Sequence, residues 1–245
     1  MSRTFTIIIP VYNEEDNLER LEMALLSFLN TVSIPTSILF VNDGSKDNSK
    51  TMIESICLHN NAFNFISLKT NKGLSTALKA GFDFVDSDLI GYMDADLQTS
   101  PEDFNLLLKH IDDYHLITGV RVSRKDTFFK KMISKTANIV RRIFTRDGMD
   151  DTGCPLKIIH SDYARRIPMF RGLHRFLPAM ILLQNGKIKQ VPIRHFSRIK
   201  GKSKFGLRNR FFGPLIDCFA YLWMKKKYVN YTIEQRKSSE NTFWQ

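Results

Sequence analysis

Apolar and polar residues follow two different rhythms in the first half of the chain. Short runs rich in β-branched and aromatic residues predict buried strands at Phe5–Val11, Ser37–Val41, Phe63–Leu68, Leu89–Met93 and His115–Val120. Between them, apolar residues recur at helical spacing and predict helices at about Glu14–Leu29, Asp47–His59, Ser75–Val85 and Pro101–Ile111. This alternation predicts an α/β fold, with a mostly parallel sheet and helices on both faces.

The second half of the chain is less regular. Its patterns predict helices at Thr127–Phe144, Asp162–Ile167, Arg175–Gln184 and about Gly206–Lys225. Short extended segments are expected at Leu156–Ile159 and Ile188–Ile193. Because no Gly/Ser/Pro-rich linker separates the halves, we expect one domain over residues 1–205, a helix within 206–230 and a polar tail over 231–245.

The distribution of charge adds a functional hint. The 245 residues carry a formal net charge of +11, but residues 1–120 hold 8 basic and 17 acidic side chains, whereas residues 121–245 hold 28 and 8. An acidic half suits a bound cation, and a basic half suits nucleic acid, a phosphorylated ligand or an anionic membrane. Three widely spaced cysteines exclude a disulfide scaffold or a Cys-rich zinc module. With no secretion signal in the N-terminal sequence, we expect a cytoplasmic protein.

Polar clusters stand where three of the predicted strands end. They read Tyr12-Asn13-Glu14, Asn42-Asp43-Gly44-Ser45 and Asp94-Ala95-Asp96-Leu97-Gln98. Because the carboxyl ends of parallel strands meet at one edge of a sheet, these clusters should converge on one cleft. Asp94 and Asp96 could share Mg²⁺ or Mn²⁺ there, or could belong to a solvated loop. Asp43 could bind a base or ribose, or complete an Asp-Gly turn, and Tyr12 could stack on a base or belong to a plain turn.

Basic residues concentrate near the end of the chain. Residues 194–210 contain seven Lys or Arg side chains and no acid, which suits a diphosphate or a lipid phosphate as well as a solvated surface. Gly201-Lys202-Ser203 is not a phosphate-binding P-loop, because position 196 is Phe. The aromatic segment Phe205–Met224 is too short to span a bilayer and is followed by three lysines. It predicts either a helix in the membrane headgroup region or a helix that packs against the core or a second copy.

Four segments together resemble the family 2 glycosyltransferases of GT-A fold, and specifically the dolichyl- and polyprenyl-phosphate sugar synthases. In chain order they read TIIIPVYNEEDNL, LFVNDGSKDNS, TNKGLSTALKAGF and IGYMDADLQTSPED. The resemblance covers about residues 4–205. It implies inverting transfer of a sugar from a UDP- or GDP-linked donor to a polyprenyl phosphate (dolichyl or undecaprenyl), with Mg²⁺ or Mn²⁺ as cofactor. It also implies peripheral binding to the cytoplasmic face of a membrane, directly or through a small membrane-protein partner.

The resemblance also assigns roles to individual positions. The nucleotide-sugar site would comprise Pro10, Tyr12, Glu14, Asp43, Asp94 and Gln98. The metal ligands would be Asp94, Asp96 and Gln98, and the catalytic residues Asp94, Asp96 and Arg121. The acceptor phosphate would be bound by Arg121, Arg175, Arg198, Lys202 and Lys204. The segment DTGCPLK at residues 151–157 departs from the Ser-Gly-Phe-Arg of many members, which leaves the role of Lys157 open.

Four alternatives to this function remain to be weighed. A family 2 enzyme with a hydroxyl acceptor would need a carboxylate base, for which Asp150 and Asp151 are the candidates. A processive polysaccharide synthase is disfavoured, because neither tryptophan lies in a Gln-x-x-Arg-Trp motif. A non-enzymatic nucleic-acid-binding protein would explain the basic half but would leave the acidic strand ends without a role, so no nucleic-acid partner is expected. A scaffold that has lost activity is disfavoured by the intact Asp94/Asp96 pair.

Overall fold

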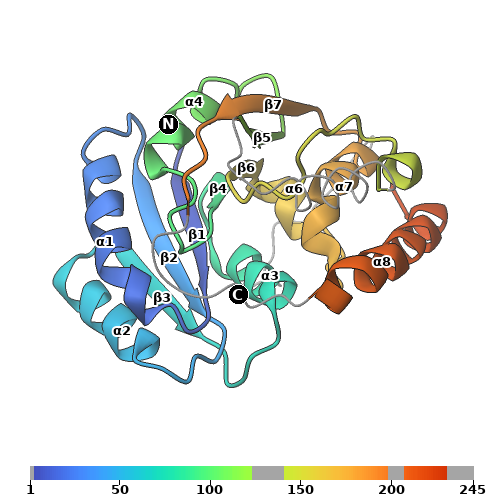
Figure 1. Ribbon diagram of the computed structural model, residues 1–245. Helices are drawn as coiled ribbons and strands as arrows, with labels where there is room; N and C mark the ends of the chain where they lie inside the picture. The colour runs from blue at the N-terminus through green and yellow to red at the C-terminus, as the bar shows by residue number, and fades with distance from the viewer. Residues whose placement is uncertain (1–2, 123–140, 198–206, 231–245) are drawn as a thin grey trace, which may run out of the picture.

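A seven-stranded sheet forms the centre of the computed structural model, which describes residues 3–122, 141–197 and 207–230, with side chains in the last range from Leu215 onward (Figure 1). Its order is β3-β2-β1-β4-β6-β5-β7. The strands are β1 Phe5–Val11, β2 Thr36–Asn42, β3 Phe63–Ser67, β4 Leu89–Tyr92, β5 Leu116–Arg121, β6 Lys157–His160 and β7 Ile188–Ile193. Among the described strands only β6 runs antiparallel to its neighbours, which confirms the mostly parallel sheet.

Helices cover both faces of the sheet, as predicted. They are α1 Glu15–Leu29, α2 Ser49–His59, α3 Leu74–Phe84, α4 Phe104–Leu108, α6 Ser161–Arg165, α7 Leu177–Leu183 and α8 Leu207–Lys227, with 3₁₀ turns at Pro101–Asp103 and Leu173–Phe176. Helices α1, α2 and α4 pack on one face, and α3, α6 and α7 on the other (Figure 1). None of the described helices combines the length and apolar character needed to cross a membrane.

The alternation of side chains along β1 explains why its sequence is apolar throughout. Ile7 and Ile9 belong to the core that faces α1, whereas Ile8 between them belongs to the core that faces α3. All three are fully buried. A strand covered on both faces must be apolar at successive positions, because each side chain enters one core or the other. The strand therefore ends where polar residues begin, which places the first polar cluster at the edge of the sheet.

The largest differences from the predicted elements lie after β5. The predicted helix Thr127–Phe144 lies mostly outside the described residues, and only its end, residues 141–145, is seen as helix. The predicted helix Pro101–Ile111 is a 3₁₀ turn followed by α4, which ends at Leu108. α8 packs its inner side chains, Cys218, Tyr221 and Met224, into the core that faces α3. It therefore adds a layer to the main domain on the side of α7 (Figure 1).

Candidate active site

The turns after β1 and β2 are tied to each other by hydrogen bonds. The backbone N–H of Asn13 donates to Oγ of Ser45 at 3.0 Å, and the N–H of Lys46 donates to Oδ1 of Asn13 at 2.8 Å. Asn13 has a φ of 51°, in the left-handed region that asparagine tolerates better than most residues. The N–H of Glu14 donates to Oγ of Ser49 at 2.8 Å. These contacts fix the end of β1 against the end of β2, so that two of the three predicted clusters meet.

Asp43 holds the loop between β3 and α3. Its carboxylate accepts hydrogen bonds from the side chain of Asn71 at 2.9 Å and from the backbone N–H groups of Lys72 and Gly73, both at 2.8 Å. Asp43 is buried, and two of these donors share Oδ2, which leaves Oδ1 with one bond and a further lone pair. Asp43 therefore shapes the wall of the site, and its predicted contact with a base or ribose stays a prediction.

A pocket of about 680 Å³ lies at the ends of β1, β2 and β3. It is lined by Tyr12, Asn42, Gly44, Ser45, Lys46, Lys50, Ser67, Leu68, Lys69, Thr70 and Asn71. The three lysines give it a positive lining, and Tyr12 gives it an aromatic ring. Pro10 and Glu14 are not among the lining residues: Pro10 pairs with Val41 within the sheet, and the carboxylate of Glu14 accepts a hydrogen bond from the side chain of Asn17 at 2.7 Å.

Asp94 and Asp96 follow β4, which is the neighbour of β1 on its other side. Oη of Tyr92 donates to Oδ1 of Asp94 at 2.8 Å, and the N–H of Gln98 donates to Oδ1 of Asp96 at 3.1 Å. Leu97 between them has a φ of 54°, which is uncommon for a large side chain and marks a constrained turn. Burial, and then the charge of Asp96, raises the pKa of Asp94 to about 6. Burial and the charge of Asp96 thus disfavour the ionised form of Asp94, and a bound cation would stabilise that form.

The donor set fits a hard divalent ion. Asp94 and Asp96 offer carboxylate oxygens, and Gln98 offers an amide oxygen. Mg²⁺ and Mn²⁺ prefer oxygen ligands of this kind, and phosphate oxygens commonly complete their coordination shell. Within residues 3–122, 141–197 and 207–230, no cluster of three or more His, Cys, Asp or Glu side chains is placed to hold a metal. The two carboxylates with Gln98 are thus the ligands that the described part of the chain offers at this turn.

Lys157 lies directly behind this turn. It pairs with Tyr92 across β4 and β6 and is fully buried. Its Nζ donates to the carbonyl oxygen of Cys154 and, at 3.4 Å, to that of Thr152. Burial lowers the pKa of Lys157, and the nearby carboxylates Asp151 and Asp94 oppose that shift. The residue whose role the sequence leaves open is therefore a buried lysine that holds the turn before β6.

Arg121 ends β5 and forms a two-pronged ion pair with Asp151. Its Nε lies 2.7 Å from Oδ2 and its Nη2 lies 2.8 Å from Oδ1, and both side chains are largely buried. Burial lowers the pKa of Arg121, but the hydrogen bonds and charge of Asp151 outweigh it, so the pKa lies above its ordinary value. Asp150 contacts Arg142 and accepts a hydrogen bond from Nε2 of Gln190 at 3.3 Å. Both candidate bases are thus paired with an arginine.

The predicted acceptor residues are only partly described. Nη1 of Arg175 lies 3.3 Å from Oδ2 of Asp217 and so joins the turn before α7 to α8. Next to it, Oγ of Ser75 accepts a hydrogen bond from the N–H of Gly172 at 3.0 Å and lies 2.8 Å from Nδ1 of His174. Arg198, Lys202 and Lys204 lie outside the described residues, so that their predicted roles, like the phosphate contacts of Arg121 and Arg175, stay predictions.

His195 is a site neighbour that sequence reasoning missed. It follows β7, and its Nδ1 lies 3.1 Å from the carbonyl oxygen of Gln98, which also accepts the N–H of Phe196 at 2.9 Å. The imidazole is therefore fixed beside the turn that carries Asp94 and Asp96. Its spacing from the other histidines fits no zinc motif, so no motif in the sequence identifies it. The available signal was its position, directly after an apolar strand, like the polar clusters after β1, β2 and β4.

Comparisons with known proteins identify the family and the fold of the chain. The sequence model of the family described as "Glycosyl transferase family 2" matches residues 6–168. Glucosyl-3-phosphoglycerate synthase from Mycobacterium tuberculosis, in complex with phosphoglyceric acid, is 13% identical over 91% of this chain and 80% of that chain, with a TM-score of 0.69. Its complex with Mn²⁺, uridine diphosphate and glucosyl-3-phosphoglycerate is 12% identical over 91% and 78%, with a TM-score of 0.67.

A third similar structure is a mannosyltransferase from Pyrobaculum calidifontis in complex with GDP-Man and Mn²⁺. It is 14% identical over 90% of this chain and 64% of that chain, with a TM-score of 0.65. At these identities the likeness concerns the fold alone. It confirms the expected α/β architecture of the GT-A type.

Proposed function

The chain belongs to glycosyl transferase family 2, and on that basis we propose that it transfers a sugar from a UDP- or GDP-linked donor to the phosphate of a polyprenyl lipid. The donor half of this proposal rests on the edge of the sheet formed by β3, β2, β1 and β4. The pocket after β1–β3 offers Tyr12 for a base and lysines for phosphates. Asp94 follows β4, two strand spacings or about 10 Å from the end of β2. A nucleoside diphosphate spans such a distance.

A divalent cation at Asp94, Asp96 and Gln98 would stabilise the negative charge that develops on the departing nucleoside diphosphate. Two hydrogen bonds orient the carboxylates: Tyr92 donates to Asp94, and the backbone N–H of Gln98 donates to Asp96. Mn²⁺ together with UDP or GDP-Man in the solved relatives supports the proposal.

The pairing of both nearby carboxylates with arginine is the observation that carries the choice of acceptor. A hydroxyl acceptor must lose its proton to a base during attack, whereas a phosphate monoester is already ionised. Asp151 is occupied by Arg121, and Asp150 by Arg142. Cationic groups would then be needed mainly to position the acceptor, which suits the basic second half of the chain.

A hydroxyl acceptor is the second candidate. The solved relative that carries glucosyl-3-phosphoglycerate favours it, since that product joins a sugar to a small phosphorylated acid. In this chain such a reaction would require Asp150 or Asp151 to leave its arginine partner when the acceptor binds.

Product analysis distinguishes the candidates. The purified chain is incubated with Mn²⁺, a panel of UDP- and GDP-sugars, and one acceptor at a time: undecaprenyl phosphate, phosphoglyceric acid or an oligosaccharide. Mass spectrometry should detect undecaprenyl phosphate with one added sugar, and Asp96→Asn should not form it. A sugar on phosphoglyceric acid or on the oligosaccharide alone would overturn the acceptor but keep the donor. Absence of nucleotide release with every acceptor would overturn both.

A further inference from the structure

α8 has one face in the core and one face in solvent. Cys218, Tyr221 and Met224 recur every three residues and are buried, and the ring of Tyr221 stacks on that of Phe176 with centroids 5.4 Å apart. The opposite side of the helix is also apolar. Its large exposed side chains are Leu215, Ile216, Phe219, Leu222 and Trp223. A contiguous group of this kind on one helix marks a surface that binds something apolar.

Three side chains of this exposed group follow helical periodicity. Ile216, Phe219 and Trp223 are 67%, 59% and 69% exposed, and their spacing of three and four residues places them along one side of α8. The helix end at residues 141–145 extends the surface: Ile143 is exposed, and the ring of Phe144 meets that of Phe219 edge to face, with centroids 5.4 Å apart. We call this surface the α8 face; it comprises Ile143, Phe144, Ile216, Phe219, Leu222 and Trp223.

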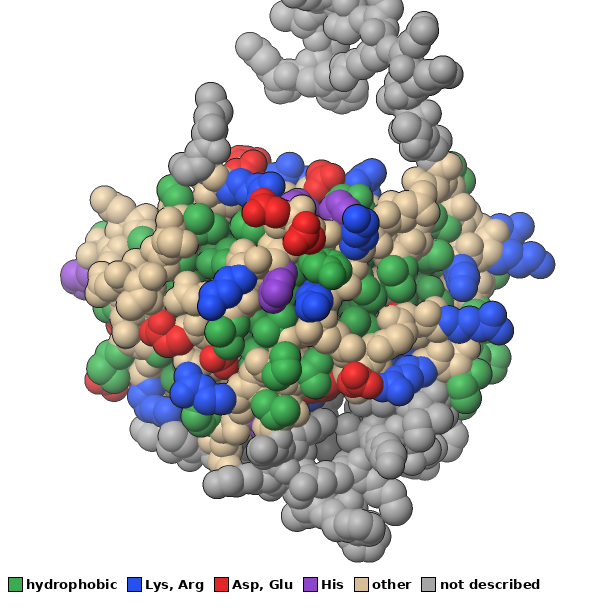
Figure 2. Space-filling view, turned by 90° about the horizontal axis from the view of Figure 1, so that it is seen from above, with side chains coloured by type: hydrophobic (Ala, Val, Ile, Leu, Met, Phe, Trp, Pro, Cys, Tyr) green, Lys and Arg blue, Asp and Glu red, His purple; other side chains and the backbone are tan. Residues whose placement is uncertain are grey.

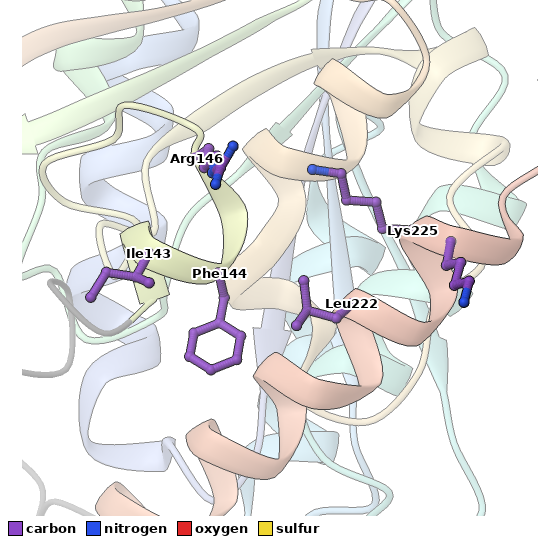
Figure 3. A pocket seen from close by; sticks show the side chains of 6 residues that line it. Ile143, Phe144, Arg146, Leu222 and Lys225 are labelled. Carbon is purple, nitrogen blue, oxygen red and sulfur yellow. The ribbon is translucent and has the colours of Figure 1, made fainter.

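A pocket of about 520 Å³ opens where the two segments of the α8 face meet. Its apolar part is formed by Ile143, Phe144 and Leu222, and its cationic part by Arg146, Lys225 and Lys226. Figure 3 shows Phe144 and Leu222 beside each other, with Arg146 on the far side of the pocket from the phenyl ring. An apolar wall joined to three cations matches an amphiphile whose head is an anion.

Among the described residues, three acids close in sequence to the residues that line this pocket are each paired with an arginine. Asp147 pairs with Arg141, Asp150 with Arg142, and Asp217 with Arg175. Arg146 and the last turn of α8, Lys225–Lys227, therefore add net positive charge beside the α8 face. Figure 2 shows basic side chains gathered along the right-hand edge of the molecule, which is the side of α8 in Figure 1.

We propose that the α8 face docks on an anionic lipid bilayer, with a lipid phosphate headgroup in the Arg146/Lys225/Lys226 pocket and with Phe219 and Trp223 in the interfacial layer. Aromatic side chains bordered by lysines are the composition of helices that lie in this layer. Charge complementarity favours a lipid as the occupant: a second copy docked through the same face would bring the same cations to the interface, whereas an anionic lipid would neutralise them. The proposal requires no sugar donor and no polyprenyl acceptor.

Vesicle flotation tests the apolar part of the surface. The full chain is mixed with vesicles of phosphatidylcholine alone, or with vesicles in which about one third of the lipid is phosphatidylglycerol. We expect binding to the anionic vesicles, and a loss of about tenfold or more in partitioning for Phe219→Ser/Trp223→Ser. The matched control is Phe84→Ser at the end of α3, which removes a phenylalanine of similar exposure, 55%, that does not belong to the α8 face and should bind like the unmodified chain.

Charge variants test the pocket. Lys225→Ala/Lys226→Ala should weaken binding to the anionic vesicles by about tenfold or more, since each lysine near such a surface contributes roughly a fivefold gain. The control Lys50→Ala/Lys109→Ala removes two exposed lysines from helices on the opposite face of the sheet and should have a small effect. Thermal unfolding of each variant shows whether its fold is kept. If a variant unfolds at a markedly lower temperature than the unmodified chain, the fluorescence of Trp223 tests the proposal in its place.

Trp223 reports its own environment without any change to the α8 face. In Trp244→Phe it is the single tryptophan, and its emission should shift to shorter wavelength when anionic vesicles are added, but not with inorganic phosphate alone. The proposal is overturned by an unchanged emission, by equal binding of the Phe219/Trp223 variant and the Phe84 variant, or by a dimer in vesicle-free solution that the Phe219/Trp223 variant abolishes.

Discussion

Gly44 is the position where the turn after β2 passes closest to the loop after β3. A Cβ atom placed on it would lie 2.6 Å from the backbone N of Asn71 and 2.6 Å from the backbone C of Thr70. Gly44 also has a φ of 64°, which costs an alanine about 1 kcal/mol or slightly more. The overlap adds about 1–3 kcal/mol, because it involves backbone atoms of a loop that Asp43 holds. We therefore expect Gly44→Ala to lower the free energy of unfolding by about 2–4 kcal/mol.

Gly148 provides the matched control. It has a nearly identical φ of 67°, but a Cβ there would meet no atom within 4 Å, so Gly148→Ala should cost only the conformational penalty of about 1 kcal/mol. Urea unfolding gives both free energies, and calorimetric titration gives the affinity for UDP and GDP. Gly44→Ala should bind nucleotide at least about tenfold more weakly, since Thr70 and Asn71 line the pocket, whereas Gly148→Ala should bind normally. Equal stability losses with unchanged nucleotide affinity in both variants would refute this account of the pocket.

Three further predictions concern the acidic turn and its surroundings. Asp96→Asn should reduce sugar transfer by at least about a hundredfold and weaken Mn²⁺ binding, as followed by product formation and by calorimetry; a near-normal rate would exclude this residue as a metal ligand. The pKa of Asp94 is raised to about 6, so the folded protein holds this proton more tightly than the unfolded chain, and metal-free protein should lose stability as the pH rises from about 4 to 6. Because Mn²⁺ must displace the same proton, its affinity should fall about tenfold per pH unit below 6. An affinity that does not depend on pH would contradict this prediction. Burial, and then the charge of Arg175, lowers the pKa of His174 to about 3. The NMR signals of its ring should therefore not titrate between pH 5 and 8. A titration midpoint near 6.5 would show instead that the ring is solvated.

The strand–helix alternation of the first half was predictable because each strand is covered on both faces. β1 begins and ends at the predicted residues, and the strands up to β5 agree within one residue at each end. The same reasoning places Tyr12, Asp43 and the Asp94–Gln98 turn along one edge of the sheet, since they follow neighbouring parallel strands. What local patterns could not supply was the partner of each side chain. The Arg121–Asp151 pair joins residues 30 positions apart, and no periodicity in the sequence indicates it.

Lys157 shows a different limit of sequence reasoning. The sequence leaves the role of this lysine open, and the structure places it inside the sheet, where it binds two carbonyl oxygens. Its burial depends on β6, the one antiparallel strand among the described strands, which brings residue 157 opposite Tyr92. That strand is only four residues long, so its sequence carries little information about its direction or its neighbours.

The central claim is that the edge of the sheet after β1–β4 is a metal-dependent nucleotide site. Calorimetric titration of UDP and of GDP into the unmodified chain, with Mn²⁺ and then with excess EDTA, tests it most directly. The account predicts saturable binding of at least one of the two nucleotides in Mn²⁺ and a loss of most of that affinity in EDTA. Binding that EDTA leaves unchanged would contradict the role of Asp94 and Asp96, and the absence of binding for both nucleotides would contradict the site itself.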